Sequence, residues 1–167
     1  MFKSLVLLFS LILSSNLFAA CAVEVSSSDN LKFNKNKLTI DSSCVEFKIN
    51  FKHNGEMAAK TAGHNVVITE SRHFESVVSK IDMSLGESSG FLPNMKEIIA
   101  KTAIIGGGSK VSVTIDATKL SKEVNYTFFC SFPGHYGAMK GVVEVIWCLY
   151  KTNVFCRTAI NVLAYVY

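Results

Sequence analysis

The chain has 167 residues and a formal net charge of +4 at pH 7. Three basic residues, Lys3, Lys151 and Arg157, lie near its two ends, and without them 14 basic and 13 acidic residues leave a charge of +1. A nearly neutral body gives no electrostatic reason to expect binding to nucleic acid or to acidic partners. Residues 21–145 suffice for one domain with a substantial hydrophobic core.

Residues 1–20 have the three parts of a secretory signal peptide. Lys3 lies near the start, residues 5–13 form an apolar run, and Ala19 and Ala20 are the small residues of a cleavage site. The run is too short for a comfortable membrane span, and a buried core helix is the weaker alternative. We therefore expect cleavage after Ala19 or Ala20 and export to an oxidising compartment, where disulfides persist.

Alternating apolar and polar side chains predict several short β-strands in the body of the chain. The predicted strands are residues 44–52, 65–69, 110–116, 125–130 and 141–146. Strands with this period have one face on a core and the other in water. Turn sequences rich in Gly, Asn and Pro separate them. Many short strands punctuated in this way predict an all-β sandwich.

One segment after the second predicted strand has a helical period instead. Its apolar residues are Phe74, Val77, Val78, Ile81 and Leu85. They recur on one face of a helix, and Ser71 is suited to be the N-cap. We expect one amphipathic helix that packs outside the sandwich as a flap. Its predicted role is to bury apolar surface, with no direct part in function.

The next feature is a short loop with three potential metal ligands. Cys130, His135 and Met139 supply a thiolate, an imidazole and a thioether within ten residues. Each alone would more often be a structural residue, but together they suit copper better than zinc. Trigonal copper sites with two His, one Cys and a long axial Met are electron-transfer centres. The second imidazole must come from elsewhere, and His64 supplies it.

These motifs closely resemble those of the azurins, small periplasmic blue-copper proteins of the cupredoxin family. The resemblance runs from about Cys21 to Val145 and includes both ligand segments. It implies a Greek-key cupredoxin β-sandwich with one external helical flap and a single copper ion. The chain departs from the family at Val66, where many azurins have a buried Trp. It also departs at Tyr136 and Gly137, where smaller or apolar side chains are commoner.

The resemblance implies a role for each residue of the site. The expected metal ligands are His64, Cys130, His135, Met139 as a weak axial ligand and, on the opposite side, the backbone carbonyl of Gly63. Around them, Asn65 is expected to join the two ligand segments near Ser131, and the backbone N–H of Phe132 to point at the Cys130 sulfur. We expect His64 to be buried and His135 to reach the surface as the port for electrons.

The resemblance also pairs Cys21 with Cys44 in a disulfide. Such a bridge stabilises by roughly 3 kcal/mol on a chain-entropy estimate. An alternative is that Cys21 is lipidated, since it directly follows two alanines. Phe18 fits a lipoprotein cleavage site poorly, and lipidation would leave Cys44 without its partner. We therefore expect a soluble periplasmic protein, with the lipid-anchored form as the alternative.

A surface around His135 is the expected docking site. By resemblance its residues are Leu31, Met57, Phe132, Pro133, Gly134 and Ala138. The implied partners are periplasmic redox proteins such as c-type cytochromes, nitrite reductase or peroxidase, bound transiently by a monomer. His53 matches an azurin position where a buried His couples protonation to redox state. Because Asn54 and Gly55 follow it, we favour a plain loop histidine.

The expected function is therefore a type 1 copper protein that shuttles single electrons and is not an enzyme. An alternative is a periplasmic copper-binding or delivery protein, although such proteins favour exposed and exchangeable ligands. A zinc-loaded structural module is a third class. Residues 146–167, with Cys148 and Cys156, fall outside the resemblance. This tail is an added strand, an aggregation-prone extension or, as we favour, a frameshift product.

Overall fold

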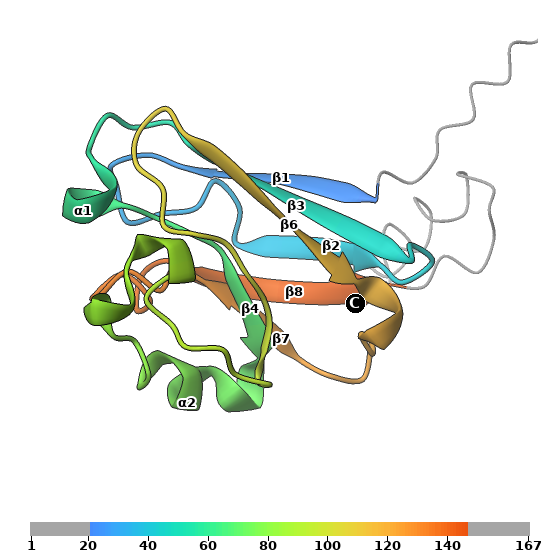
Figure 1. The fold of residues 1–167 in the computed structure, drawn as a ribbon. Helices are drawn as coiled ribbons and strands as arrows, with labels where there is room; N and C mark the ends of the chain where they lie inside the picture. The colour runs from blue at the N-terminus through green and yellow to red at the C-terminus, as the bar shows by residue number, and fades with distance from the viewer. Residues whose placement is uncertain (1–20, 147–167) are drawn as a thin grey trace, which may run out of the picture.

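The structure, a computed structural model, describes residues 21–146 and shows two β-sheets packed face to face (Figure 1). The predicted signal peptide and all but the first residue of the tail lie outside the described residues. The strands are β1 (Ala22–Ser27), β2 (Lys37–Asp41), β3 (Glu46–His53), β4 (Val67–Glu70), β5 (Ile98–Lys101), β6 (Lys110–Asp116), β7 (Tyr126–Phe129) and β8 (Lys140–Ile146).

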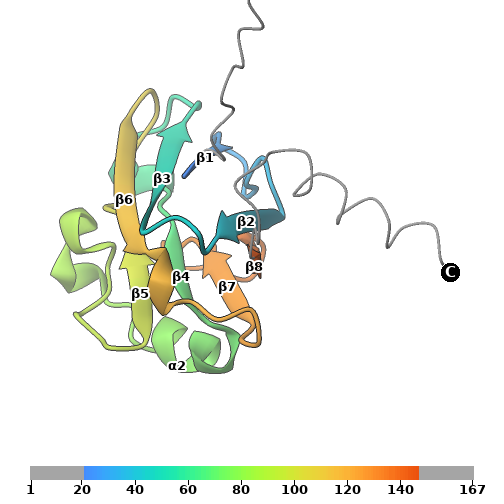
Figure 2. The same cartoon turned by 90° about the vertical axis from the view of Figure 1, so that its right-hand side faces the viewer.

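The strands form a three-stranded sheet and a five-stranded sheet. Their orders are β1-β3-β6 and β2-β8-β7-β4-β5, and Figure 2 shows the three-stranded sheet above the five-stranded sheet. β1 runs parallel to β3 and β2 parallel to β8, while the other pairs are antiparallel. Most consecutive strands along the chain lie in different sheets, so the predicted Greek-key sandwich is confirmed.

All five predicted strands are present, and β6 has the predicted bounds. The structure adds β1, β2 and β5, which were not predicted. In β3 the burial alternates along the strand, so Phe47, Ile49 and Phe51 lie in the core. The expected disulfide between Cys21 and Cys44 is also present, and it ties the start of β1 to the turn before β3.

The predicted helical flap is present, but its α-helix is shorter than predicted and does not continue to Leu85. The helical elements are α1 (Ala59–Ala62), η1 (Ser71–His73), α2 (Phe74–Val78), η2 (Met83–Leu85), η3 (Glu87–Ser89) and η4 (Ala117–Lys119). Ser71 caps no helix, because its hydroxyl bonds to the Thr127 hydroxyl at 2.8 Å. The chain turns away after α2, since the Asp82 carboxylate accepts the Ser84 N–H at 2.8 Å. Leu85 is consequently exposed rather than packed.

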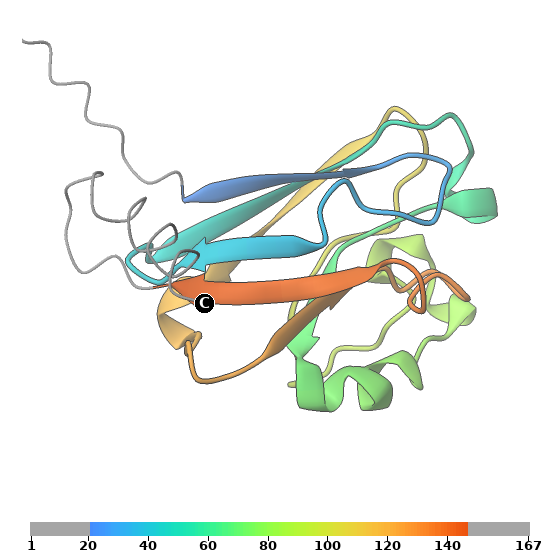
Figure 3. The same ribbon diagram turned by 180° about the vertical axis from the view of Figure 1, so that it is seen from behind.

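The segment 71–92, called the flap below, still covers one side of the sandwich. Phe74 and Val77 of α2 bury their side chains against Val67, Leu92 and Phe129. Figure 3 shows the flap from behind, beside the five-stranded sheet. Among the described residues no helix has the length and apolar character needed to span a bilayer.

Strand direction brings the two ligand segments together. His64 lies just before β4, and Cys130 directly follows β7. β4 and β7 are antiparallel neighbours with Val67 opposite Phe129, so the start of one strand meets the end of the other. The potential ligands therefore gather at one end of the sandwich, near α1 in Figure 1.

Candidate metal centre

Three buried donor atoms form a compact triangle at this end of the sandwich. The Nδ1 atoms of His64 and His135 lie 3.1 Å apart, and the Cys130 Sγ lies 3.8 Å from each. A point equidistant from the three atoms is about 2.1 Å from each, close to ordinary metal–nitrogen and metal–sulfur bond lengths. The donor set of two imidazoles and a thiolate therefore fits a metal ion held in trigonal geometry.

The His64 ring is oriented by a hydrogen bond on its far side. Its Nε2 lies 2.9 Å from the Ser28 carbonyl oxygen, which can only accept, so Nε2 carries the proton. Nδ1 is then unprotonated and directs its lone pair into the triangle. Backbone bonds in both directions with Ile105, at 3.0 and 2.9 Å, hold the chain at His64. The Ser28 contact was not predicted, because it joins segments 36 residues apart.

Cys130 is fully buried at the start of the ligand loop. Burial raises the pKa of its thiol to about 11, although the backbone N–H groups of Phe132 and Asn65 bond to the sulfur and act in the opposite direction. The Phe132 contact is the one expected from the sequence, and the Asn65 backbone contact is additional. A bound metal ion reverses the effect of burial, because it stabilises the thiolate directly.

The loop from Cys130 to Met139 is closed by its own backbone. The Met139 carbonyl accepts the Cys130 N–H at 3.0 Å, and the His135 carbonyl accepts the Met139 N–H at 2.8 Å. Gly134 has φ of 82°, a left-handed conformation that favours glycine. The fully buried Met139 side chain lies in the same apolar cluster as Cys130.

Gly63, on the other ligand segment, is also sterically required. A Cβ at this position would collide with the Ala59 carbonyl oxygen and the Ile104 side chain. The close approach of α1 thus leaves room only for glycine beside His64.

Asn65 joins the two ligand segments. Its side-chain oxygen accepts the Ser131 N–H at 2.8 Å, and its amide nitrogen donates to the Ser131 hydroxyl at 2.8 Å and the Thr102 carbonyl at 3.1 Å. Asn65 and Ser131 are both fully buried, so these bonds compete with no solvent. The arrangement holds residues on either side of the metal-binding triangle in a fixed relation.

Burial favours the neutral form of both ligand histidines at neutral pH. Burial, and next the neighbouring His135 imidazole, lower the pKa of His64 to about 4. Burial also lowers the pKa of His135. Since neutral imidazoles bind metal ions and protonated ones do not, neither histidine needs to lose a proton at neutral pH before it binds a metal ion.

Comparison with known proteins identifies the family. The model of copper-binding proteins of the plastocyanin/azurin family matches residues 19–146. The chain belongs to this family. The azurin of Alcaligenes faecalis is 41% identical over 127 residues, covering 75% of this chain and 98% of that protein. The azurin of Pseudomonas aeruginosa is 39% identical over 139 residues, covering 83% and 93% respectively.

A solved structure agrees with these relatives. The azurin Az-iso2 of Methylomonas sp. strain J superposes with a TM-score of 0.72 at 37% identity, covering 77% of this chain and 99% of that one. The fold is therefore the cupredoxin fold. With the His64, Cys130 and His135 group, the family makes this chain a copper-binding, blue-copper electron-transfer protein and not an enzyme.

The residues expected to form the docking surface around His135 differ in their exposure to solvent, and Pro133 is half-buried. Leu31 and Met57 are 43% and 47% exposed, and Gly134 and Ala138 are also exposed. Phe132 is only 8% exposed, because its ring packs into the apolar cluster around Cys130 rather than facing outward.

Two loops of this surface are tied together by Asp29. Its carboxylate accepts the backbone N–H groups of Glu56, at 2.9 Å, and Met57, at 3.1 Å, and these bonds lower its pKa. Asp29 was not predicted to have a role, although an Asp-Asn pair between strands is a turn signal.

His53 was assigned to a loop, and this placement was wrong. It is the last residue of β3, fully buried, with its ring stacked on that of His64 at a centroid distance of 4.8 Å. Its Nδ1 accepts the Gly55 N–H at 3.1 Å, and its Nε2 lies 3.2 Å from the Ala62 carbonyl. Both ring nitrogens therefore have partners, and His53 forms a wall of the metal centre.

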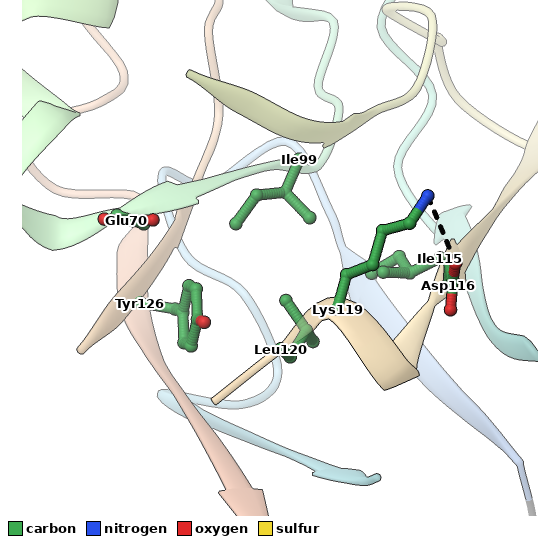
Figure 4. A pocket seen from close by; sticks show the side chains of 7 residues that line it. All are labelled: Glu70, Ile99, Ile115, Asp116, Lys119, Leu120 and Tyr126. Carbon is green, nitrogen blue, oxygen red and sulfur yellow. Dashed lines mark ion pairs between the residues drawn. The ribbon is translucent and has the colours of Figure 1, made fainter. Parts of the chain in front are cut away.

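A separate hollow of about 270 Å³ lies away from the metal centre (Figure 4). It is lined by Glu70, Ile99, Ile115, Asp116, Lys119, Leu120 and Tyr126. Glu70 and Tyr126 lie at the ends of β4 and β7 remote from the ligands. An ion pair of 3.2 Å between Lys119 and Asp116 lies at this hollow, which contains no cysteine or histidine.

Proposed function

We propose that the chain shuttles single electrons between periplasmic redox proteins through copper bound by His64, Cys130 and His135. The observation that carries this proposal is the buried triangle of three donor atoms. In the same proposal Met139 and the Gly63 carbonyl are weak axial ligands. Copper supplies the one-electron Cu(II)/Cu(I) couple, and the protein supplies a geometry that changes little between the two states.

Each residue of the centre has a role in this proposal. Backbone N–H groups that bond to the Cys130 sulfur weaken electron donation from the thiolate to Cu(II). The oxidised state is thereby less favoured, and the reduction potential rises. The Asn65–Ser131 bonds limit relative movement of the ligand segments. His135 is 9% exposed while His64 and Cys130 are fully buried, so its ring is the route by which electrons leave.

Partners would dock on the exposed residues around His135. Leu31, Met57, Gly134 and Ala138 offer a small surface with few charges. Small interfaces suit redox partners that must separate quickly. We propose c-type cytochromes, nitrite reductase or peroxidase as candidate partners of a monomer, on the basis of the azurin resemblance.

We also propose that residues 1–20 are a signal peptide and that 21–145 are the mature domain in the periplasm. Cys21 is in a disulfide with Cys44, which favours ordinary cleavage over lipidation of Cys21. Peptide mapping of the exported protein under non-reducing conditions tests this proposal. A linked Cys21–Cys44 peptide is expected, and an acylated Cys21 would show a lipid-anchored protein instead.

Copper delivery is the competing function, and burial of the donors argues against it. An exchangeable site needs ligands that a partner can reach, but His64 and Cys130 are fully buried. Voltammetry of the copper-loaded protein distinguishes the two functions. Reversible one-electron oxidation and reduction with retained copper is expected, whereas colourless Cu(I) that passes readily to a competing chelator would indicate delivery. Zinc found in native protein would favour a structural module.

A further inference from the structure

The flap contacts the ligand loop and does more than cover the sandwich. Figure 1 shows the flap in green, with its later turns beside the loop that joins β7 and β8. Two residues of the flap, Gly90 and Phe91, make the contacts described next. Both have left-handed backbone conformations, with φ of 67° and 56°.

Phe91 has an unfavourable backbone conformation for its side chain. Among the residues that the structure describes, it is the one non-glycine residue with positive φ. A side chain with a Cβ crowds the backbone in this region, so the surroundings must favour the conformation strongly for it to persist. Two backbone bonds do so: Phe91 donates to the Gly86 carbonyl at 3.3 Å and accepts from the Asp82 N–H at 2.8 Å.

The left-handed turn places the Phe91 ring against the metal centre. Phe91 is 2% exposed and lies in one apolar cluster with Cys130, Phe132 and Met139. Its ring meets that of Phe132 edge to face, at a centroid distance of 5.8 Å and an angle of 68°. The Phe132 ring in turn stacks on His135 at 4.4 Å and 27°. A row of three rings thus runs from the flap to His135, which at 9% exposure is the least buried of the three ligand residues.

Gly90 provides a second connection to the same loop. Its carbonyl accepts the Ser131 hydroxyl at 2.6 Å, and Ser131 is the residue held by Asn65. A Cβ on Gly90 would lie 2.8 Å from the Asn65 side-chain nitrogen. The close approach of the flap backbone therefore completes the hydrogen bonds that join the two ligand segments.

On the other side of His135, the loop also packs under the flap. The Tyr136 side chain is half-buried against the cluster that contains Phe74, Leu92 and Phe129. The ligand loop is therefore in contact with the flap on both sides of His135.

From these contacts we infer that Phe91 is a positioning residue for the metal centre: its ring fixes Phe132, and through Phe132 the orientation of His135. This inference deepens the proposed electron-transfer function and rests on it for its redox consequence. The mechanical consequence concerns the metal-free protein alone. A loop held by Phe91 is ordered before any metal binds, which limits rearrangement when the oxidation state changes.

The first test is amide hydrogen exchange in the metal-free protein, comparing Phe91→Leu with Phe47→Leu. Phe47 is an apt control because it is also 2% exposed but lies in the main core between the sheets, outside the cluster around Cys130. Both variants lose one buried ring. We expect the amide exchange rates of His135, Ala138 and Met139 to rise at least fivefold more in Phe91→Leu than in Phe47→Leu. The rates are compared under conditions in which the two variants have the same free energy of unfolding.

A second variant separates the ring from the backbone conformation. Phe91→Gly removes the ring but suits the left-handed turn, so the turn itself should be retained. It should loosen the loop as Phe91→Leu does, and it also serves if Phe91→Leu does not fold. Unchanged loop exchange in the folded Phe91 variants would show that Phe91 only packs, and the inference would be wrong.

The copper-loaded variants test the redox consequence separately. Phe91→Leu should slow electron self-exchange at least threefold, while Phe47→Leu should leave the rate within experimental error of the parent. A rate unchanged in Phe91→Leu, despite a looser loop, would overturn the link between positioning and electron transfer. Failure of the parent protein to undergo reversible redox would instead contradict the proposed function, and the exchange result on metal-free protein would stand.

Discussion

Side chains at the metal centre are buried, and burial shifts their pKa values from the ordinary ones. Burial raises the pKa of the Cys130 thiol to about 11 and lowers that of His64 to about 4. Copper binding must therefore release the thiol proton but no imidazole proton at neutral pH. The same two pKa shifts make the stability of the metal-free protein depend on pH.

The metal-free protein should be most stable between about pH 6.5 and 9. Below 6.5 the unfolded chain protonates His64 while the folded chain resists until about pH 4, so the free energy of unfolding falls as the pH falls. Above 9 the unfolded chain loses the Cys130 proton, and the folded chain keeps it until about pH 11, so stability falls again. Urea titrations at pH 5, 7.5 and 10 measure this, and a flat profile would contradict it.

The Met139 thioether should tune the copper centre without being needed to bind copper. Met139→Leu keeps an apolar side chain of similar volume in the buried cluster. It removes a weak donor that favours Cu(II), so the potential should rise by on the order of 60 mV, which is a tenfold change in relative affinity. Voltammetry and metal analysis measure both quantities. Complete loss of copper would show that Met139 is an essential ligand.

Among the elements, those with a regular pattern could be predicted from sequence. Residues 110–116 alternate cleanly and form β6 with the same bounds. β5 was missed because it has four residues, its Ile98 and Ile99 are both half-buried, and its pairing with β4 is irregular after Ile68. The flap helix was predicted too long, because apolar periodicity continues past the point where Asp82 takes the Ser84 N–H.

The same distinction holds for the metal centre. Cys130 and His135 share one loop with ligand spacing, so this group could be predicted together with His64. The contacts that orient these ligands could not, since the Ser28 carbonyl and the Phe91 ring reach the centre only through the tertiary fold. A left-handed phenylalanine has no signature in a single sequence.

The disulfide should stabilise the junction of β1 and β3. Cys21 and Cys44 flank the segment that contains β1 and β2, and the bridge closes a separation of 23 residues. Replacing both cysteines with serine should lower the free energy of unfolding by about 3 kcal/mol and leave copper binding intact, because the bridge is remote from the ligands. Denaturant titration measures the loss. A change in the visible spectrum of the copper-loaded variant would show that the disulfide does affect the metal centre.

At the scale of the whole molecule, the eight described strands and the three donor residues all lie within residues 21–146. The Ile146 carbonyl accepts both the backbone N–H and the hydroxyl of Ser42, at 2.9 and 3.1 Å, so β8 is needed to its last residue. Residues 147–167, which include Cys148 and Cys156, lie outside the described residues.

A chain that ends at Ile146 should therefore fold, bind copper and be at least as soluble as the full chain. Residues 147–167 are largely apolar, and two cysteines fewer remove the chance of mispairing with Cys21 or Cys44 during export. Thermal unfolding and copper content of the two forms test this prediction. If the shortened chain unfolds or loses copper, the tail is an integral part of the domain.

The central claim is that Cys130 binds copper as a thiolate together with His64 and His135. The most direct measurement is the visible spectrum of the purified protein on addition of one equivalent of Cu(II), compared with that of Cys130→Ser. The account predicts an intense blue colour in the parent protein and none in the variant, because the colour arises from charge transfer between the thiolate sulfur and copper. A Cys130→Ser protein that remains blue would contradict it.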